Sequence, residues 1–201
     1  MRNFFEFLPT LVFALVVLSW VAFAASFGLR KQPATAPDQK RDRGSIVGLG
    51  LQGLSYAVVW FWHRPFLTPI VWGSNARDAV ALSAGVFAIA AAVGSVWLVI
   101  VAVKTLGKEW SLTARLVAGH KLAVSGPYAY VRHPIYTGML GMLLATGLAI
   151  SFWQALLVAL LVFLAGTIIR VRSEEKLLRE AFGGQFENYV QRVPALVPGL
   201  Y

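Results

Sequence analysis

Residues 134–169 read PIYTGMLGMLLATGLAISFWQALLVALLVFLAGTII, and this stretch decides the fold. It consists of two apolar runs, residues 134–150 and 152–169, with little more than Ser151 between them. A helix that crosses the hydrocarbon core of a bilayer needs about 20 apolar residues, so both runs are at the short end of the range. We predict a tight helical hairpin in the membrane, whose two outer ends return to the same membrane face.

Three more apolar segments precede the hairpin, at residues 8–29, 45–62 and 79–103. The whole chain has 201 residues, of which 58% are hydrophobic and only 13% are charged. A soluble domain of this size needs more polar surface to cover its core. The sequence therefore predicts an all-α, polytopic integral membrane protein with about five transmembrane helices.

The positive charges predict how these helices are oriented. Residues 30–44, residues 104–133 and the tail from Arg170 each hold five Lys or Arg residues, which together are 15 of the 18 in the chain. Five spans put all three segments on one side, and positively charged loops favour the cytoplasm. We expect the N-terminus outside and these segments inside. From the chain's compact size alone, we expect the membrane to be a prokaryotic cytoplasmic membrane.

Composition also argues against several classes of function. The chain has no cysteine and three scattered histidines, so we predict no metal site. The net charge of +9 is explained by the loops between apolar spans, so we predict no nucleic-acid partner. The spans carry no internal charges and no evident repeat, which disfavours channels, pumps and inverted-repeat transporters.

Polar residues gather at the two outer ends of the hairpin. Residues 120–138 read HKLAVSGPYAYVRHPIYTG, and Pro134 suits the first turn of a helix. Such a helix start offers free N–H groups to a carboxylate or a ribose hydroxyl. The alternative is that Arg132, His133 and Tyr136 are ordinary anchors at the membrane interface.

The second outer end is residues 170–184, RVRSEEKLLREAFGG. A spacing of four residues places Glu174 on the helix face of Arg170, with Glu175 rotated partly away. The alternative here is a simple ion pair at the membrane surface, followed by an amphipathic helix lying on the bilayer. Because the hairpin returns both ends to one face, the further alternative is a single site made from both segments.

Together the two segments resemble the isoprenylcysteine carboxyl methyltransferase family and the related membrane phospholipid and thiol methyltransferases. The resemblance lies in Gly126-Pro-Tyr, in Arg132-His-Pro-Ile-Tyr-Thr-Gly, and in the run from Arg170 through Glu174-Glu175 to Phe182-Gly183. It covers roughly residues 104–198. It implies N-terminal transmembrane helices in residues 1–103 and, in residues 104–201, a catalytic region with the hairpin and a cytoplasmic cofactor pocket, the two parts forming one structural unit.

The resemblance further implies an S-adenosylmethionine-dependent methyltransferase that acts on a lipophilic small molecule or a lipidated acceptor among membrane lipids. Arg170 would hold the acceptor near the methyl donor, with Glu175 as the adjacent candidate for catalysis. The residues implied to bind the cofactor are His120, Leu122, Ala123, Tyr128, His133, Pro134, Tyr136 and Glu174. Ala123 departs from the family, where a larger aliphatic residue is frequent, and Phe186 stands in place of a common tyrosine.

The chemistry of these residue types fits the implied reaction. Aromatic faces and a carboxylate stabilise a sulfonium cation, which Tyr128, Tyr136 and Glu174 would provide. A carboxylate acceptor is already ionised at neutral pH, and Arg170 would orient it through two parallel hydrogen bonds. A thiol or amine acceptor needs a base, for which Glu175 or His133 are the candidates.

Two other functions remain open from the sequence. An NADPH-dependent membrane sterol or enone reductase carries a related Arg-His…Asn-Tyr pattern, but residue 135 is isoleucine here rather than asparagine. A non-enzymatic scaffold or transporter would bind no cofactor and would tolerate replacement of Glu174.

Overall fold

The computed structural model describes residues 2–28, 38–41, 44–65, 68, 77–112, 115–117, 121–197 and 199. These residues form five long apolar helices: α1 (Arg2–Gly28), α2 (Gly44–Phe61), α3 (Arg77–Leu106), α4 (Pro134–Ile150) and α5 (Trp153–Phe182). The shorter elements are the 3-10 turns η1 (Gly107–Glu109) and η2 (Gly126–Ala129), helix α6 (Gly184–Val190), and an antiparallel pair of strands, β1 (Asp38–Arg41) and β2 (Arg115–Val117).

Four of the long helices have the length and composition needed to cross a membrane. They contain the candidate spans Phe7–Gly28, Gly44–Phe61, Ala79–Leu106 and Trp153–Phe182. Helix α4 is apolar but has 17 residues, which is about 25 Å at a rise of 1.5 Å per residue. The prediction of an all-α, polytopic membrane protein is confirmed, and α4 is the fifth, shorter helix of the predicted set.

Helix α5 is much longer than the predicted span of residues 152–169. It runs without interruption from Trp153 to Phe182, so the residues expected at the exit of a span lie well inside a helix of 30 residues. Residues 170–182 contain no glycine or proline that would break the helix. It ends at Gly183, whose φ of 48° favours glycine.

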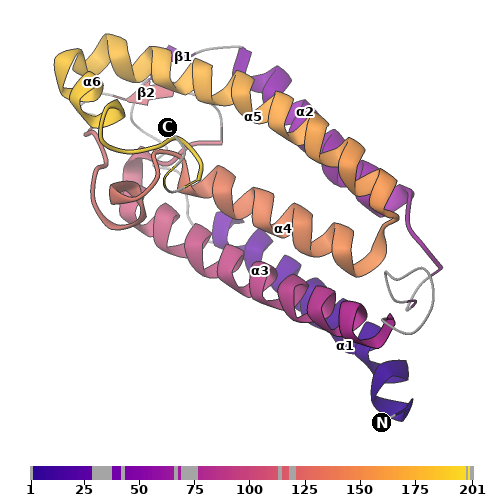
Figure 1. Cartoon of the computed structure of the whole chain (residues 1–201). Helices are drawn as coiled ribbons and strands as arrows, with labels where there is room; N and C mark the ends of the chain where they lie inside the picture. Colours follow the sequence, from indigo (N-terminus) through magenta and orange to yellow (C-terminus); the bar gives the residue numbers. More distant parts are fainter. Residues whose placement is uncertain are drawn as a thin grey trace.

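Helix α4 lies between two pairs of helices, α2 with α5 on one side and α1 with α3 on the other (Figure 1). Helices α2 and α5 approach closely because Gly48 faces Gly166. A Cβ atom added to Gly166 would lie 2.7 Å from the Gly48 carbonyl oxygen and 2.9 Å from the Leu51 Cβ. This close packing, which small residues allow between membrane helices, sets how near α2 comes to the C-terminal half of α5.

The turn between α4 and α5 is held by the end of α2 and by the segment that follows it. The Ser151 hydroxyl donates to the Val59 carbonyl, and the Arg64 guanidinium donates to the carbonyls of Leu148 and Ala149 at the end of α4. A cation at a helix C-terminus also interacts favourably with the helix dipole. The hairpin is therefore anchored at its turn, and its two other ends lie together at the opposite end of the bundle (Figure 1).

We expect Gly166→Ala to lower the free energy of unfolding by about 1–3 kcal/mol, because the added methyl group would push α2 away from α5. The measurement is thermal unfolding of the purified protein in detergent. Gly53→Ala is the matched control on α2, since a Cβ there would meet nothing within 4 Å. Equal losses in the two variants would contradict the role given to the Gly48–Gly166 contact.

Candidate active site

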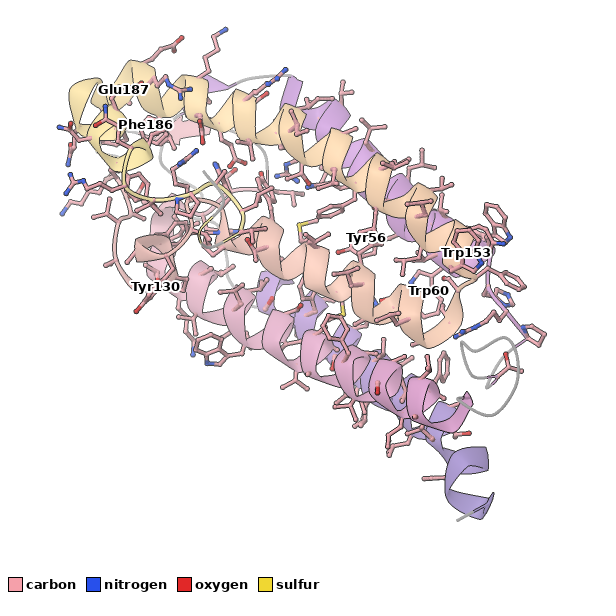
Figure 2. The ribbon with its side chains drawn as sticks, in the orientation of Figure 1. Tyr56, Trp60, Tyr130, Trp153, Phe186 and Glu187 are labelled. Carbon is pink, nitrogen blue, oxygen red and sulfur yellow. The ribbon has the colours of Figure 1, made fainter. Side chains whose placement is uncertain are left out.

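A pocket opens where α4 begins, beside the second half of α5. Its empty volume is about 1210 Å³, which includes space open to solvent. Its polar wall is made by Glu109, Lys121, Arg132, His133, Arg170 and Glu174. Figure 2 shows the same end of the molecule by the labels of Phe186 and Glu187, with Trp60 and Trp153 at the other end.

The two segments that flank the hairpin meet in this pocket. The Tyr136 hydroxyl donates a hydrogen bond to Glu174 Oε1, and His133 Nδ1 lies 3.3 Å from Glu174 Oε2. The rings of His133 and Tyr136 are stacked, with their centroids 5.6 Å apart. The two segments are about 40 residues apart in the sequence, and their side chains meet in one site, as the hairpin hypothesis requires.

Arg170 lies beside this constellation and is buried, with 4% of its surface exposed. Its guanidinium carbon lies 4.9 Å from the centre of the Tyr136 ring, and Nη2 lies 3.9 Å from Glu174 Oε1. Nη2 also donates to the Leu112 carbonyl at 2.5 Å. Among the described residues, Nε has no hydrogen-bond partner. Arg170 is therefore a positively charged part of the pocket wall.

Glu175 points away from the pocket and does not belong to its lining. One of its oxygens lies 3.0 Å from Arg132 Nε and 3.3 Å from His133 Nε2, and the other accepts from Arg179. Glu175 therefore contacts Nε2 of the His133 ring, whereas Glu174 contacts Nδ1. The structure does not place this predicted catalytic candidate where it would touch an acceptor.

His133 is held between two carboxylates, and its pKa reflects both. Burial alone lowers the pKa of a histidine, but the hydrogen bonds and charges of Glu174 and Glu175 outweigh this effect and raise the pKa of His133. The phenols beside the site are hard to ionise. Burial raises the pKa of Tyr128, and burial is also the main cause that raises the pKa of Tyr189 to about 12.

The start of α4 differs from the expected open anion site. The backbone N–H groups of Arg132 and His133 donate to the carbonyls of Pro194 and Ala195, and the Thr137 hydroxyl donates to the Leu196 carbonyl. The Tyr136 N–H bonds back to the His133 carbonyl. The C-terminal tail therefore lies against the start of α4 and uses the N–H groups of the two residues that precede the helix.

The other predicted cofactor residues divide into three groups. Leu122, Ala123 and Tyr128 line the pocket together with His133, Tyr136 and Glu174. Pro134 is buried as the first residue of α4 and lies outside the pocket lining. His120 lies outside the described residues. The roles of all these residues in binding stay predictions.

Sequence reasoning missed the residues that the first helices and the loop after α3 contribute. Phe27 of α1 stacks on Trp110, with ring centroids 5.9 Å apart, and both line the pocket with Leu49 of α2. Glu109 and Lys121 also line it. An aromatic residue or a leucine in an apolar span looks the same whether it faces lipid or a pocket, so the sequence held no signal for them. Residues from both sides of the predicted division at residue 103 line the pocket.

The profile of a known protein family, phospholipid methyltransferase, matches residues 83–185, just over half of the chain. The chain belongs to the phospholipid methyltransferase family. This confirms the resemblance found in the two motif segments, both of which lie largely inside the matched region. The match begins within α3, so α1 and α2 lie outside it.

Individual relatives are similar over shorter stretches. The chain is 35% identical over 79 residues to protein-S-isoprenylcysteine O-methyltransferase of Schizosaccharomyces pombe, covering 39% of the chain and 34% of the relative. It is 33% identical over 116 residues to the nickel-cobalt-cadmium resistance protein NccN of Alcaligenes xylosoxydans xylosoxydans, covering 56% and 53%. It is 36% identical over 77 residues to methanethiol S-methyltransferase of Crocosphaera subtropica, covering 35% and 27%.

The chain spans between about a quarter and a half of the length of these relatives. Two of them are named for methyl transfer, one to oxygen and one to sulfur, and one is named for metal resistance. Within the described part of the chain, no three His, Cys, Asp or Glu side chains gather in a way that could hold a metal ion.

We expect the stability of the site to depend on pH through His133. A raised pKa in the folded state means that protonated His133 contributes stability fully below its unfolded pKa of about 6.5, and that this contribution is lost as the pH rises through the folded value. The thermal stability lost in His133→Gln should therefore be larger near pH 6 than near pH 9. Thermal unfolding in detergent at both pH values checks this, and a loss independent of pH would contradict it.

Proposed function

We propose that the chain is a membrane methyltransferase that moves a methyl group from S-adenosylmethionine to a lipophilic acceptor. The observation that carries the proposal is the contact of His133 and Tyr136 with Glu174 inside the pocket. Membership of the phospholipid methyltransferase family supports it, as do the methyltransferase names of two relatives.

The residues present fit the proposed donor. When bound, S-adenosylmethionine would supply a methyl group on a positively charged sulfonium sulfur. The acceptor would bond to the methyl carbon in line as the carbon–sulfur bond breaks and S-adenosylhomocysteine leaves. Glu174 would face this charge as a carboxylate held in place by Tyr136 and His133, and the rings of Tyr128 and Tyr136 would add their electron-rich faces. Leu122 and Ala123 are suited to the apolar and backbone contacts of a nucleoside.

The apolar wall of the pocket fits a lipophilic acceptor. Phe27, Leu49, Leu106, Ile135 and Met139 line it, from α1, α2, α3 and α4. Since these helices lie in the membrane, a hydrocarbon tail would reach the pocket from the lipid. The donor would enter from the water at the end where the positively charged segments lie, which we propose to be the cytoplasmic side.

Catalysis in this arrangement rests on alignment. An in-line displacement gains much of its rate from holding the two reacting atoms close together, and effective molarities reach about 10⁵–10⁸ M in well-oriented systems. Arg170 lies next to Glu174 in the pocket lining, and its guanidinium is suited to hold an acceptor head group.

Titration calorimetry of the purified protein with S-adenosylhomocysteine tests the donor site. We expect Glu174→Ala and His133→Ala each to weaken binding roughly tenfold or more, because each removes charge-assisted hydrogen bonds of about 1.5–3 kcal/mol. Glu187→Ala is the matched control, since Glu187 is exposed on α6 and pairs with Arg179 outside the pocket.

Binding of NADPH in place of S-adenosylhomocysteine would favour the reductase alternative over methyl transfer. Unchanged S-adenosylhomocysteine affinity in both site variants would remove Glu174 and His133 from the donor site.

A separate prediction concerns Arg170. With a radiolabelled donor and membrane lipid as the acceptor source, Arg170→Ala should reduce turnover by more than it reduces S-adenosylhomocysteine affinity, because its proposed role is toward the acceptor. Arg172→Ala is the matched control, since Arg172 lies two residues further along α5 and is not part of the pocket lining. Equal losses of turnover and donor affinity in Arg170→Ala would place Arg170 in the donor site instead.

A further inference from the structure

Helix α2 carries a polar side chain at a position where an apolar one would be expected. Gln52 lies in the middle of the candidate span Gly44–Phe61 and is fully buried, with 0% of its surface exposed. A polar side chain within a membrane-spanning helix is costly unless it finds partners, and it therefore points to a specific role. Gln52 lies outside the family match, which starts at residue 83.

Both ends of the Gln52 amide are used. Its Nε2 donates to Thr167 Oγ1 at 2.9 Å, and its Oε1 accepts from Arg170 Nη1 at 3.0 Å. Both partners are on α5 and both are buried. Thr167 therefore fixes which way the amide faces, and the amide presents its oxygen to the guanidinium.

The guanidinium is then held at two points from different parts of the chain. Gln52 takes Nη1, and the Leu112 carbonyl takes Nη2. Gly48, one turn before Gln52, leaves room for the Arg170 stem, since a Cβ there would lie 2.5 Å from Arg170 Cγ. The plane of the guanidinium, and with it the direction of the unpartnered Nε, is set by these contacts.

We propose that Gln52 is a positioning residue, which directs the Arg170 guanidinium into the pocket without cancelling its charge. The neutral amide of Gln52 accepts a hydrogen bond from the guanidinium as a glutamate would, but it does not neutralise the positive charge of Arg170. Glu174 Oε1 lies 3.9 Å from Arg170 Nη2, and the Glu174 carboxylate is shared with His133 and Tyr136. The inference rests on the proposed function, and it narrows the acceptor to a lipophilic molecule with an anionic head group.

The test compares two probes with the same hydrocarbon chain, dodecanoate and dodecanol. Each is titrated by calorimetry into the full-length protein with S-adenosylhomocysteine present. The variants are Gln52→Leu, which removes both hydrogen bonds, and Gln52→Glu, which keeps the shape and adds a negative charge. Ser55→Ala is the matched control, because Ser55 is equally buried on α2 and its hydroxyl donates to the Gln52 backbone carbonyl rather than to Arg170.

Gln52→Leu should weaken dodecanoate binding about tenfold or more, because a hydrogen bond to a charged group is lost. Gln52→Glu should weaken dodecanoate binding and leave dodecanol binding as in the wild type. Ser55→Ala should bind both probes as the wild type does, and S-adenosylhomocysteine affinity should be unchanged in all variants, which also reports that they are folded.

Wild-type dodecanoate affinity in Gln52→Leu would overturn the positioning role. Equal effects of Gln52→Glu on dodecanoate and dodecanol would overturn the charge argument. Failure of the proposed function looks different. Suppose that the wild type binds dodecanoate more tightly than dodecanol, that this difference is lost in the Gln52 variants, and that no methyl transfer is detected. The positioning role of Gln52 would then be supported, and the proposed methyl transfer would be contradicted.

Discussion

The structure of the site depends on keeping the carboxylate of Glu174 paired inside a membrane protein. Tyr136 and His133 reach it from the start of α4, and Arg170 lies one turn away on its own helix. The Glu174 side chain is partly buried, with 26% of its surface exposed, and a partly desolvated carboxylate is stabilised by such partners. The stacking of His133 on Tyr136 keeps the two partners side by side.

Much of the remaining structure maintains that pairing. Ser151 and Arg64 hold the hairpin turn at the far end, and the C-terminal tail covers the start of α4. Glu175 ties His133 to Arg132 and Arg179 from behind. The site is therefore fixed from three directions, and polar groups held in this way lower the cost of aligning reactants.

The pocket also joins the part of the chain that matches the family to helices that do not match it. Phe27 and Leu49 complete its apolar wall, and Gln52 reaches Arg170 across the close crossing of α2 and α5. The family profile covers residues 83–185, which include the residues that we assign to the donor. The two helices before it shape the side that we assign to the acceptor, where the named relatives differ between oxygen and sulfur as the methylated atom.

The sequence by itself determined the membrane-spanning helices, the hairpin and the meeting of its two polar ends, because hydrophobic length and a one-residue break leave few other arrangements. It also marked His133, Tyr136, Arg170 and Glu174, which the structure brings together. Only the tertiary structure decided that Glu175 turns away, that the tail occupies the start of α4, and that Gln52 reaches Arg170. Those outcomes depend on which faces of distant helices meet, and local sequence patterns do not encode that.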